Sequence, residues 1–278
     1  MNKRSILSME INNLYCIDNV EGMKQLPDNF VDLTVTSPPY DGLRKYNGYS
    51  FDFENVAKQL FRITKEGGVV VWIVGDETKN GTESGTSFRQ ALYFKEIGFN
   101  LHDTMIWNKP TMPLSHNRYE QAFEYMFVLS KGKPNTFNGI REKYAESTVT
   151  RINSGDAYSY KHRKGQVGEN IVKSKKRILN PSGSLQKNVW NISPDNKLSK
   201  DEKYLLAHPA RFPEEICLKH IISWSNDGDL VFDPFVGSGT TAKVAKQLNR
   251  SYLGFDISQK YINIAEERLK KWTGTKNL

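Results

Sequence analysis

The chain has 278 residues and a formal net charge of +8, and 38% of its residues are hydrophobic. That length suits one large α/β domain with an insertion or two small domains, with enough apolar residues for a packed core. The two cysteines, Cys16 and Cys217, lack metal-ligand spacing, and no apolar leader or membrane-length run is present, so we expect no metal ion and a cytoplasmic protein without a membrane partner.

Strand-like and helix-like segments alternate along the first half of the chain. Strands are expected at 14–18, 31–36, 69–74, 101–107 and 123–129, and helices at 18–26, 53–64 and 87–97. The run 69–74 is β-branched or aromatic throughout, which is typical of a strand buried on both faces. Gly67-Gly68 is expected to end the helix before it.

The composition changes between 131 and 203, where Lys, Arg, Ser, Asn and Gly dominate without a strong periodicity. Residues 131–200 hold 15 Lys and Arg against 5 Asp and Glu, whereas the rest of the chain holds 24 against 26. We expect part of this region to be disordered without its ligand. The confined positive charge predicts a nucleic-acid-binding region on a nearly neutral enzyme body.

Regular structure is expected again near the C-terminus, with helices at 213–224, 240–248 and 259–272 and strands at 230–232 and 252–255. The alternation along the whole chain predicts an α/β fold, in which helices cover a largely parallel sheet.

The segment Asp233-Pro234-Phe235-Val236-Gly237-Ser238-Gly239-Thr240-Thr241 lies between an expected strand and an expected helix. Its glycines allow a tight turn and close approach of a ligand, and a helix N-terminus offers free N–H groups. Asp256 ends the next strand, where an acid can bind both hydroxyls of a ribose. A P-loop is disfavoured, because the nearest lysine, Lys243, already lies inside the helix. This order of features favours a nucleoside cofactor over a purely structural turn.

A second motif, Thr36-Ser37-Pro38-Pro39-Tyr40, directly follows the apolar run 31–35. The exocyclic amino group of cytosine or adenine is a poor nucleophile, and an enzyme can help by accepting hydrogen bonds from it. The Ser37 hydroxyl and the Pro38 carbonyl offer two acceptors, and consecutive prolines stiffen the turn. Tyr40 offers a flat face for a base flipped out of its duplex. An ordinary Pro-Pro turn is the structural alternative.

Together the two motifs resemble the amino DNA methyltransferases of the permuted, or beta, class, in which the catalytic motif precedes the cofactor motif. The resemblance covers nearly the whole chain. It implies a Rossmann-like, S-adenosylmethionine-dependent methyltransferase sheet with helices on both faces over 1–130 and 204–278. The basic target-recognition insertion would span 131–203. The resemblance implies double-stranded DNA as the partner. It leaves open whether a cognate restriction endonuclease accompanies the protein and whether the protein forms a homodimer.

The resemblance also assigns residues to the site. The catalytic motif would be Ser37, Pro38, Pro39 and Tyr40. The cofactor would be bound by Asp18, Thr36, His208, Phe212, Asp233, Pro234, Phe235, Gly237, Ser238, Gly239, Thr240 and Asp256. Asp18 could equally cap the helix that follows it, and His208 and Phe212 could only position the helix after Pro213.

Serine at the first position of the family motif is commonest among N4-cytosine enzymes, whereas aspartate is usual among N6-adenine enzymes. Ser37 therefore favours cytosine N4, with adenine N6 as the alternative. The insertion would contact DNA phosphates through Lys161, Arg163, Lys164, Lys173, Lys175, Lys176 and Arg177. A solvated charge run is the alternative there.

Other functions compete with DNA amino-methylation. C5-cytosine methylation is disfavoured, because it needs a cysteine nucleophile and both cysteines resemble small buried residues. An inactive nucleic-acid-binding protein with the same fold, and methylation of RNA or of a protein amide, are more distant alternatives. Asp76, at the end of the strand 69–74, either points into the crevice at the carboxyl edge of the sheet or caps a loop.

Overall fold

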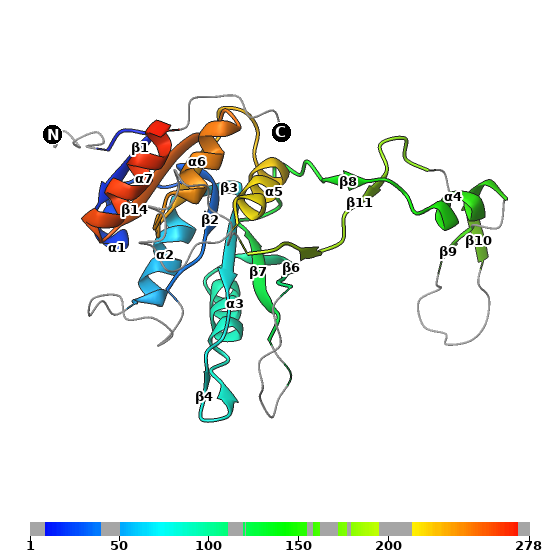
Figure 1. The fold of residues 1–278 in the computed structure, drawn as a ribbon, viewed down its shortest axis with the longest axis horizontal. Helices are drawn as coiled ribbons and strands as arrows, with labels where there is room; N and C mark the ends of the chain where they lie inside the picture. The colour runs from blue at the N-terminus through cyan, green and yellow to red at the C-terminus, as the bar shows by residue number, and fades with distance from the viewer. Residues whose placement is uncertain are drawn as a thin grey trace. The chain divides into compact units, whose positions relative to one another are not determined.

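The computed structural model describes residues 9–39, 51–110, 119, 121–154, 158–161, 172–176, 179–194 and 213–271, and for 158–161 and 172–176 it describes the backbone alone. The chain divides into two compact units (Figure 1), one formed by 1–138 with 188–278 and the other by 139–187. Within the described residues, no helix is long and apolar enough to cross a membrane.

The first unit is built on an eight-stranded sheet with the order β1-β14-β13-β2-β3-β7-β6-β12. Its strands are β1 (Asn13–Cys16), β2 (Val31–Thr36), β3 (Thr64–Val74), β6 (Asn100–Asn108), β7 (Phe123–Ser130), β12 (Val189–Asn191), β13 (Leu230–Asp233) and β14 (Ser251–Asp256). Only β7 runs antiparallel to its neighbours. The carboxyl ends of the other seven strands therefore lie at one edge of the sheet.

Six helices accompany the described part of this sheet: α1 (Asn19–Lys24), α2 (Phe53–Ile63), α3 (Thr86–Glu96), α5 (Glu214–Trp224), α6 (Thr240–Gln247) and α7 (Gln259–Lys271). The buried residues of α1, α2 and α3 pack in one apolar cluster, and those of α5 and α6 in a second. Along β3, Val70 and Trp72 join the first cluster, whereas Val71 and Ile73 join the second. The sheet is thus covered on both faces, as the sequence predicts.

The expectation for Gly67-Gly68 is wrong. Helix α2 ends at Ile63, and β3 begins at the next residue. Gly67 lies inside the strand with a φ of +78°, and its N–H donates to the Lys131 carbonyl at 2.6 Å. A Cβ at this position would lie 2.2 Å from the Asn135 side chain, so the glycine allows a close approach to the segment that follows β7.

The sequence analysis also missed a hairpin after β3, formed by β4 (Thr78–Lys79) and β5 (Thr82–Glu83). Its two turn residues, Asn80 and Gly81, both have positive φ, at 52° and 79°. Asn-Gly favours this kind of two-residue turn, because both residues tolerate the left-handed region.

The second unit contains β8 (Arg141–Glu142), α4 (Glu146–Asn153), β9 (Tyr158–Lys161), β10 (Val172–Lys176) and β11 (Ser184–Leu185). Strands β8 and β11 pair antiparallel, as do β9 and β10. The unit spans 139–187 and is thus narrower than the predicted region 131–203. Its role in DNA recognition stays a prediction.

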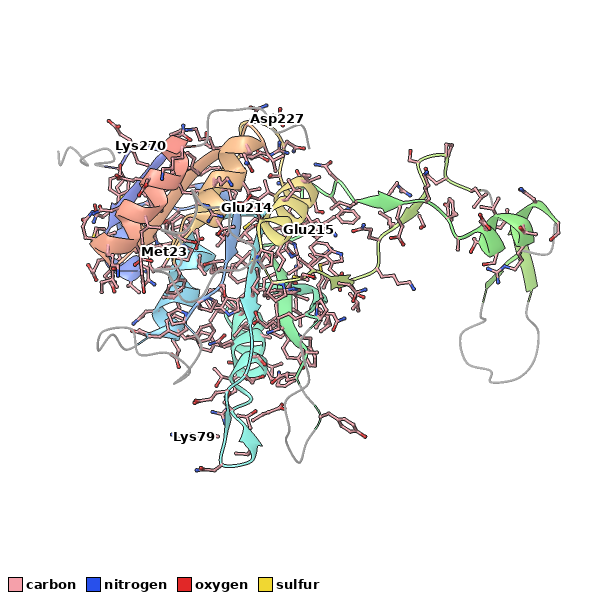
Figure 2. All side chains as sticks on the ribbon, in the orientation of Figure 1. Met23, Lys79, Glu214, Glu215, Asp227 and Lys270 are labelled. Carbon is pink, nitrogen blue, oxygen red and sulfur yellow. The ribbon has the colours of Figure 1, made fainter. Side chains whose placement is uncertain are left out.

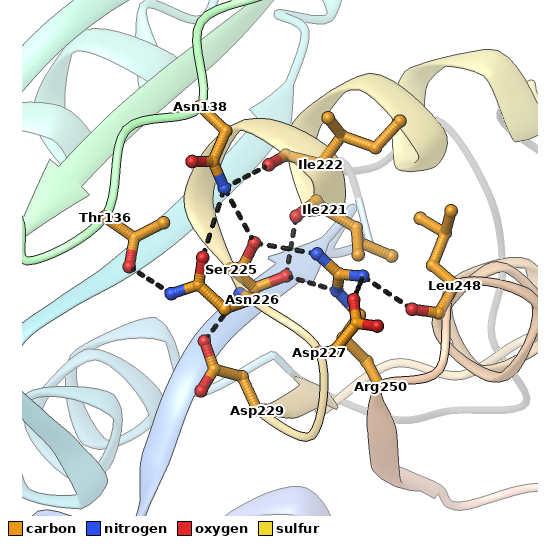
Figure 3. A network of polar contacts seen from close by, with 10 residues as sticks. All are labelled: Thr136, Asn138, Ile221, Ile222, Ser225, Asn226, Asp227, Asp229, Leu248 and Arg250. Atoms are coloured by element: carbon orange, nitrogen blue, oxygen red, sulfur yellow. Dashed lines mark hydrogen bonds and ion pairs between the residues drawn. The ribbon is translucent and has the colours of Figure 1, made fainter.

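The residues before and after the second unit are tied to the first. The Asn138 side-chain amide donates to the carbonyls of Ile222 and Ser225, at 3.2 and 3.1 Å, at the end of α5 (Figure 3). On the other side, the Asn188 carbonyl accepts the Ile106 N–H at 2.8 Å, and β12 then pairs with β6. These contacts explain why 131–138 and 188–194 belong to the first unit.

Candidate functional site

Polar residues end four adjacent strands at the carboxyl edge of the sheet. Asp233 ends β13, Asp256 ends β14 and Thr36 ends β2, while Asp18 follows β1. Cys16 of β1 pairs with Asp256, and β13 lies between β14 and β2. Ligands of open α/β sheets bind outside the carboxyl ends of the strands, so this edge is the candidate site.

Asp233 lies at the centre of this edge and is 3% exposed. Its Oδ1 accepts the Thr36 hydroxyl at 2.6 Å and the Phe235 N–H at 3.0 Å. Burial raises the pKa of Asp233 to about 6, although these hydrogen bonds act to lower it. Burial therefore destabilises the ionised form of Asp233, and a positively charged ligand would stabilise it.

The Thr36–Asp233 hydrogen bond joins the two sequence motifs directly. A second hydrogen bond strengthens the junction, since the Thr241 hydroxyl donates to the Val35 carbonyl at 3.1 Å. All four residues are buried. The end of β2 is therefore held in a fixed position relative to the start of α6.

The glycine loop, residues 237–240, is held by Asp256. The Asp256 Oδ2 accepts the Gly237 N–H at 2.9 Å, and its Oδ1 accepts the Ser258 N–H at 2.8 Å. Burial raises the pKa of Asp256, while the two backbone hydrogen bonds oppose that change. A carboxylate offers about four lone-pair positions, so Asp256 retains acceptor capacity for hydroxyl groups.

Gly239 precedes the first residue of α6 and has a φ of 76°. A Cβ there would lie 2.7 Å from the Ala265 Cβ and 3.0 Å from the Ala265 Cα, so α7 leaves no space for a side chain. Among the described residues, no side chain caps the start of α6. Its first N–H groups therefore suit an external acceptor such as a carboxylate.

Asp18 caps α1, because its Oδ1 accepts the N–H groups of Val20 and Glu21 at 2.9 and 3.1 Å. The capping alternative is thus confirmed, and a cofactor contact stays a prediction. Asp76 is likewise a capping residue. Its Oδ1 accepts the Ser87 N–H at 2.9 Å and the Ser84 hydroxyl at 3.1 Å, which stabilises the start of α3.

Ser37, Pro38 and Pro39 directly follow β2, with Pro38 buried and the other two partly exposed. Tyr40, His208 and Phe212 lie outside the described residues. In the second unit, Lys161 lies on β9 and Lys173, Lys175 and Lys176 on β10, and these two strands pair. Arg163, Lys164 and Arg177 lie outside the described residues.

Sequence reasoning missed Arg268 of α7, which is 6% exposed and donates to the Thr240 hydroxyl at 2.8 Å. The signal was present but weak. Arg268 lies three residues after Ala265 and next to Leu269, both buried, so a cation stands beside the apolar stripe of α7. Buried arginines are rare without a partner.

Comparisons with known proteins agree on one family. The family model for DNA methylases of the N6/N4 type matches residues 31–267. The orphan methyltransferase M.BamHII of Bacillus amyloliquefaciens is 51% identical over 250 residues, which cover 90% of this chain and 92% of the relative. The type II methyltransferase M1.MboII of Moraxella bovis is 30% identical over 273 residues, covering 92% and 96%.

Solved structures share the fold. The PvuII DNA methyltransferase, described as cytosine-N4-specific, superimposes with a TM-score of 0.67 at 21% identity, covering 94% of this chain and 87% of that one. A complex of M1.HpyAVI with S-adenosylmethionine gives a TM-score of 0.59 at 21% identity, covering 92% and 98%. The Rossmann-like methyltransferase fold predicted from the sequence is thus confirmed, and the family match over 31–267 shows that the chain is a DNA methyltransferase that belongs to the N6/N4 DNA methylase family.

Proposed function

We propose that this DNA methyltransferase transfers a methyl group from S-adenosylmethionine to the exocyclic N4 amino group of cytosine in duplex DNA. The Thr36–Asp233 hydrogen bond carries the proposal, because it joins the residue before Ser37 to the first residue of the motif that would hold the cofactor. Serine at position 37 favours cytosine. The fold similarity to a cytosine-N4-specific enzyme is consistent with that choice.

The residues at the sheet edge fit the cofactor. S-adenosylmethionine carries a positive sulfonium and amino group, a carboxylate and a ribose. The buried Asp233 carboxyl, with its pKa raised to about 6, suits the cationic part. The uncapped start of α6 suits the carboxylate, and Asp256 suits the ribose hydroxyls. When bound, the cofactor supplies an electrophilic methyl group.

Ser37 and Pro38 would prepare the base for attack. In this proposal the Ser37 hydroxyl and the Pro38 carbonyl accept hydrogen bonds from the two N–H groups of the cytosine amine. These acceptors stabilise the positive charge that grows on the nitrogen as it forms its bond to carbon. They also fix the direction of attack. In this transfer the bond between the methyl carbon and the sulfonium sulfur would break, and the sulfur would keep the electron pair as a neutral thioether. One amine proton would then pass to solvent, which leaves the product amine neutral.

The base must leave its duplex to reach this edge, because the amine of a paired cytosine is engaged in base pairing. Tyr40 would stack on the flipped base. The lysines of β9 and β10 would contact DNA phosphates, which fix the position of the enzyme but carry no sequence information. These roles rest on the sequence motif and on the confined positive charge.

Product analysis tests the proposal. Purified protein is incubated with unmethylated DNA and S-adenosylmethionine, and the DNA is digested to nucleosides for mass spectrometry. We expect N4-methylcytosine. N6-methyladenine as the product would instead assign the enzyme to the other branch of the family and overturn the base assignment.

A variant tests the role of Ser37. Ser37→Ala removes one acceptor from the amine, so we expect kcat to fall by about 10- to 1000-fold. Calorimetry should show an unchanged Kd for S-adenosylmethionine, because the Thr36–Asp233 bond is intact. Loss of cofactor binding by this variant would contradict the assigned role.

A further inference from the structure

Arg268 of α7 contacts the glycine loop, residues 237–240, through its guanidinium group. Its Nη1 donates to the Ser238 carbonyl at 3.2 Å, to the Ser238 hydroxyl at 3.3 Å and to the Thr240 hydroxyl at 2.8 Å. Arg268, Ser238 and Thr240 are 6%, 3% and 4% exposed. A single guanidinium group thus donates hydrogen bonds to the residues on both sides of Gly239. Gly239 has a positive φ and directly precedes the first residue of α6.

The same guanidinium binds a carboxylate on another helix. Arg268 Nη2 donates to Glu214 Oε1 at 2.6 Å, and the Lys243 ammonium of α6 donates to the same oxygen. Glu214 is the first residue of α5 (Figure 2). The network therefore joins α5, α6 and α7 at the glycine loop.

The charges in this network depend on one another. Burial acts to raise the pKa of Glu214, but Arg268 and Lys243 outweigh burial and lower it. Removing one member of such a partly buried network leaves the others without compensation. The network therefore favours the conformation of the glycine loop in which all of these contacts are made.

We propose that Arg268 is a positioning residue for the cofactor, because it holds the glycine loop in the form that presents its backbone N–H groups and, through Glu214, sets the loop relative to α5. This inference rests on the proposed function of the loop as the S-adenosylmethionine site. Arg268 would not contact the reacting atoms. Its effect would appear in cofactor affinity and in KM, with kcat at saturating cofactor largely retained.

Arg250 provides a matched control. Its side chain is also mostly buried, at 9% exposed, and it donates to the carbonyls of Ser225 and Leu248 and to Asp227 (Figure 3). It precedes β14, whereas the glycine loop lies past the carboxyl ends of the strands. Arg250→Met should therefore lower Tm without changing cofactor affinity.

The experiment compares Arg268→Met, Arg268→Lys and Arg250→Met by calorimetry with S-adenosylmethionine, at a temperature well below each Tm. We expect Kd to rise by about 10- to 100-fold in Arg268→Met, since charge-assisted hydrogen bonds are lost. Arg268→Lys should recover part of the loss. Glu214→Gln, which keeps the shape and removes the charge, should weaken binding in the same direction.

The inference fails if Arg268→Met binds the cofactor as tightly as the unmodified protein, or if Arg250→Met weakens binding equally. A fall in kcat with an unchanged KM would also overturn it. The proposed function is distinguishable, since cofactor binding without any methylated nucleoside would reject that function alone. If the unmodified protein did not bind S-adenosylmethionine, both would fall.

Discussion

Asp233 combines deep burial with a place at the edge where a cation is expected. Among the described residues, its hydrogen-bond donors include the Thr36 hydroxyl and the Phe235 N–H, neither of which carries a charge, and the negative charge of Asp256 raises its pKa further. A buried carboxylate without a cationic partner resists ionisation. Asp233 is therefore poised to gain such a partner from a ligand, and its protonation should be coupled to ligand binding.

This coupling predicts a pH dependence of cofactor affinity. The pKa of Asp233 in the free protein is about 6, and a bound cation would lower it. Affinity for S-adenosylmethionine should therefore be constant well above pH 6 and fall as the pH decreases through 6, by at most about tenfold per pH unit. Calorimetry from pH 5 to 7 would measure this. Asp233→Asn should bind weakly with a flatter profile, and an equal slope in that variant would assign the dependence elsewhere.

At the scale of elements, α7 packs against the glycine loop and limits the conformations that the loop can adopt. Ala265 occupies the space that a side chain at position 239 would need, and Arg268 binds the residues on both sides of that glycine. The loop conformation is thus determined by a helix that follows it in the chain. Small residues at 239 and 265 are a condition of this packing.

Two glycine substitutions separate backbone strain from packing. Gly239→Ala adds a Cβ at 2.7 Å from Ala265, whereas a Cβ at Gly81 meets nothing within 4 Å, and both glycines have positive φ. We expect Gly81→Ala to cost about 1 kcal/mol of unfolding free energy for the strained φ alone. Gly239→Ala should cost about 2–4 kcal/mol and abolish cofactor binding. Denaturant titration compares them, and equal losses would contradict the packing argument.

Elements with strong local patterns are predictable from the sequence. The run 69–74 predicts a strand buried on both faces, and that prediction is confirmed because alternate residues enter the two clusters. Gly67 led to a wrong prediction of where α2 ends. Its conformation allows contacts with Lys131 and Asn135, which are distant in the chain. Strand β12 has no local signature. It is three residues long and is defined by pairing with β6.

The candidate site also contains residues that the sequence predicts and residues that it does not. The two motifs predict which residues meet at the sheet edge, because strand ends and a glycine turn are local features. The Thr36–Asp233 hydrogen bond confirms that the motifs are adjacent. For Arg268 the sequence shows only a cation beside an apolar stripe, and its role could not be predicted because that role depends on how α7 packs against a loop formed elsewhere in the sequence.

At the scale of the whole molecule, one buried histidine should govern stability in acid. His220 is fully buried between Trp190, at 4.7 Å between ring centroids, and Met126, and burial lowers its pKa to about 3. The folded protein therefore binds fewer protons here than the unfolded chain below pH 6.5. Its stabilising contribution is complete above pH 6.5 and is lost as the pH falls towards 3.

The prediction concerns the difference between the unmodified protein and His220→Phe. Between pH 6.5 and 4, the unmodified protein should lose about 3 kcal/mol more unfolding free energy than the variant. Asp233 acts in the opposite direction, since its raised pKa favours the folded state as the pH falls, but that effect is common to both proteins. Urea titrations at several pH values would measure the difference. Parallel pH profiles would show that His220 does not titrate on unfolding.

The order of the strands in the sheet has a consequence for folding during translation. β1, made early, has β14 as its partner among the described strands, and β2 has β13 on one side, so both pairings require strands from the C-terminal part of the chain. The loop then needs α7, which ends at Lys271. Pairings of such long separation form late in folding. A nascent chain therefore cannot complete these pairings, or the contacts of the glycine loop with α7, until β14 and α7 have left the exit tunnel.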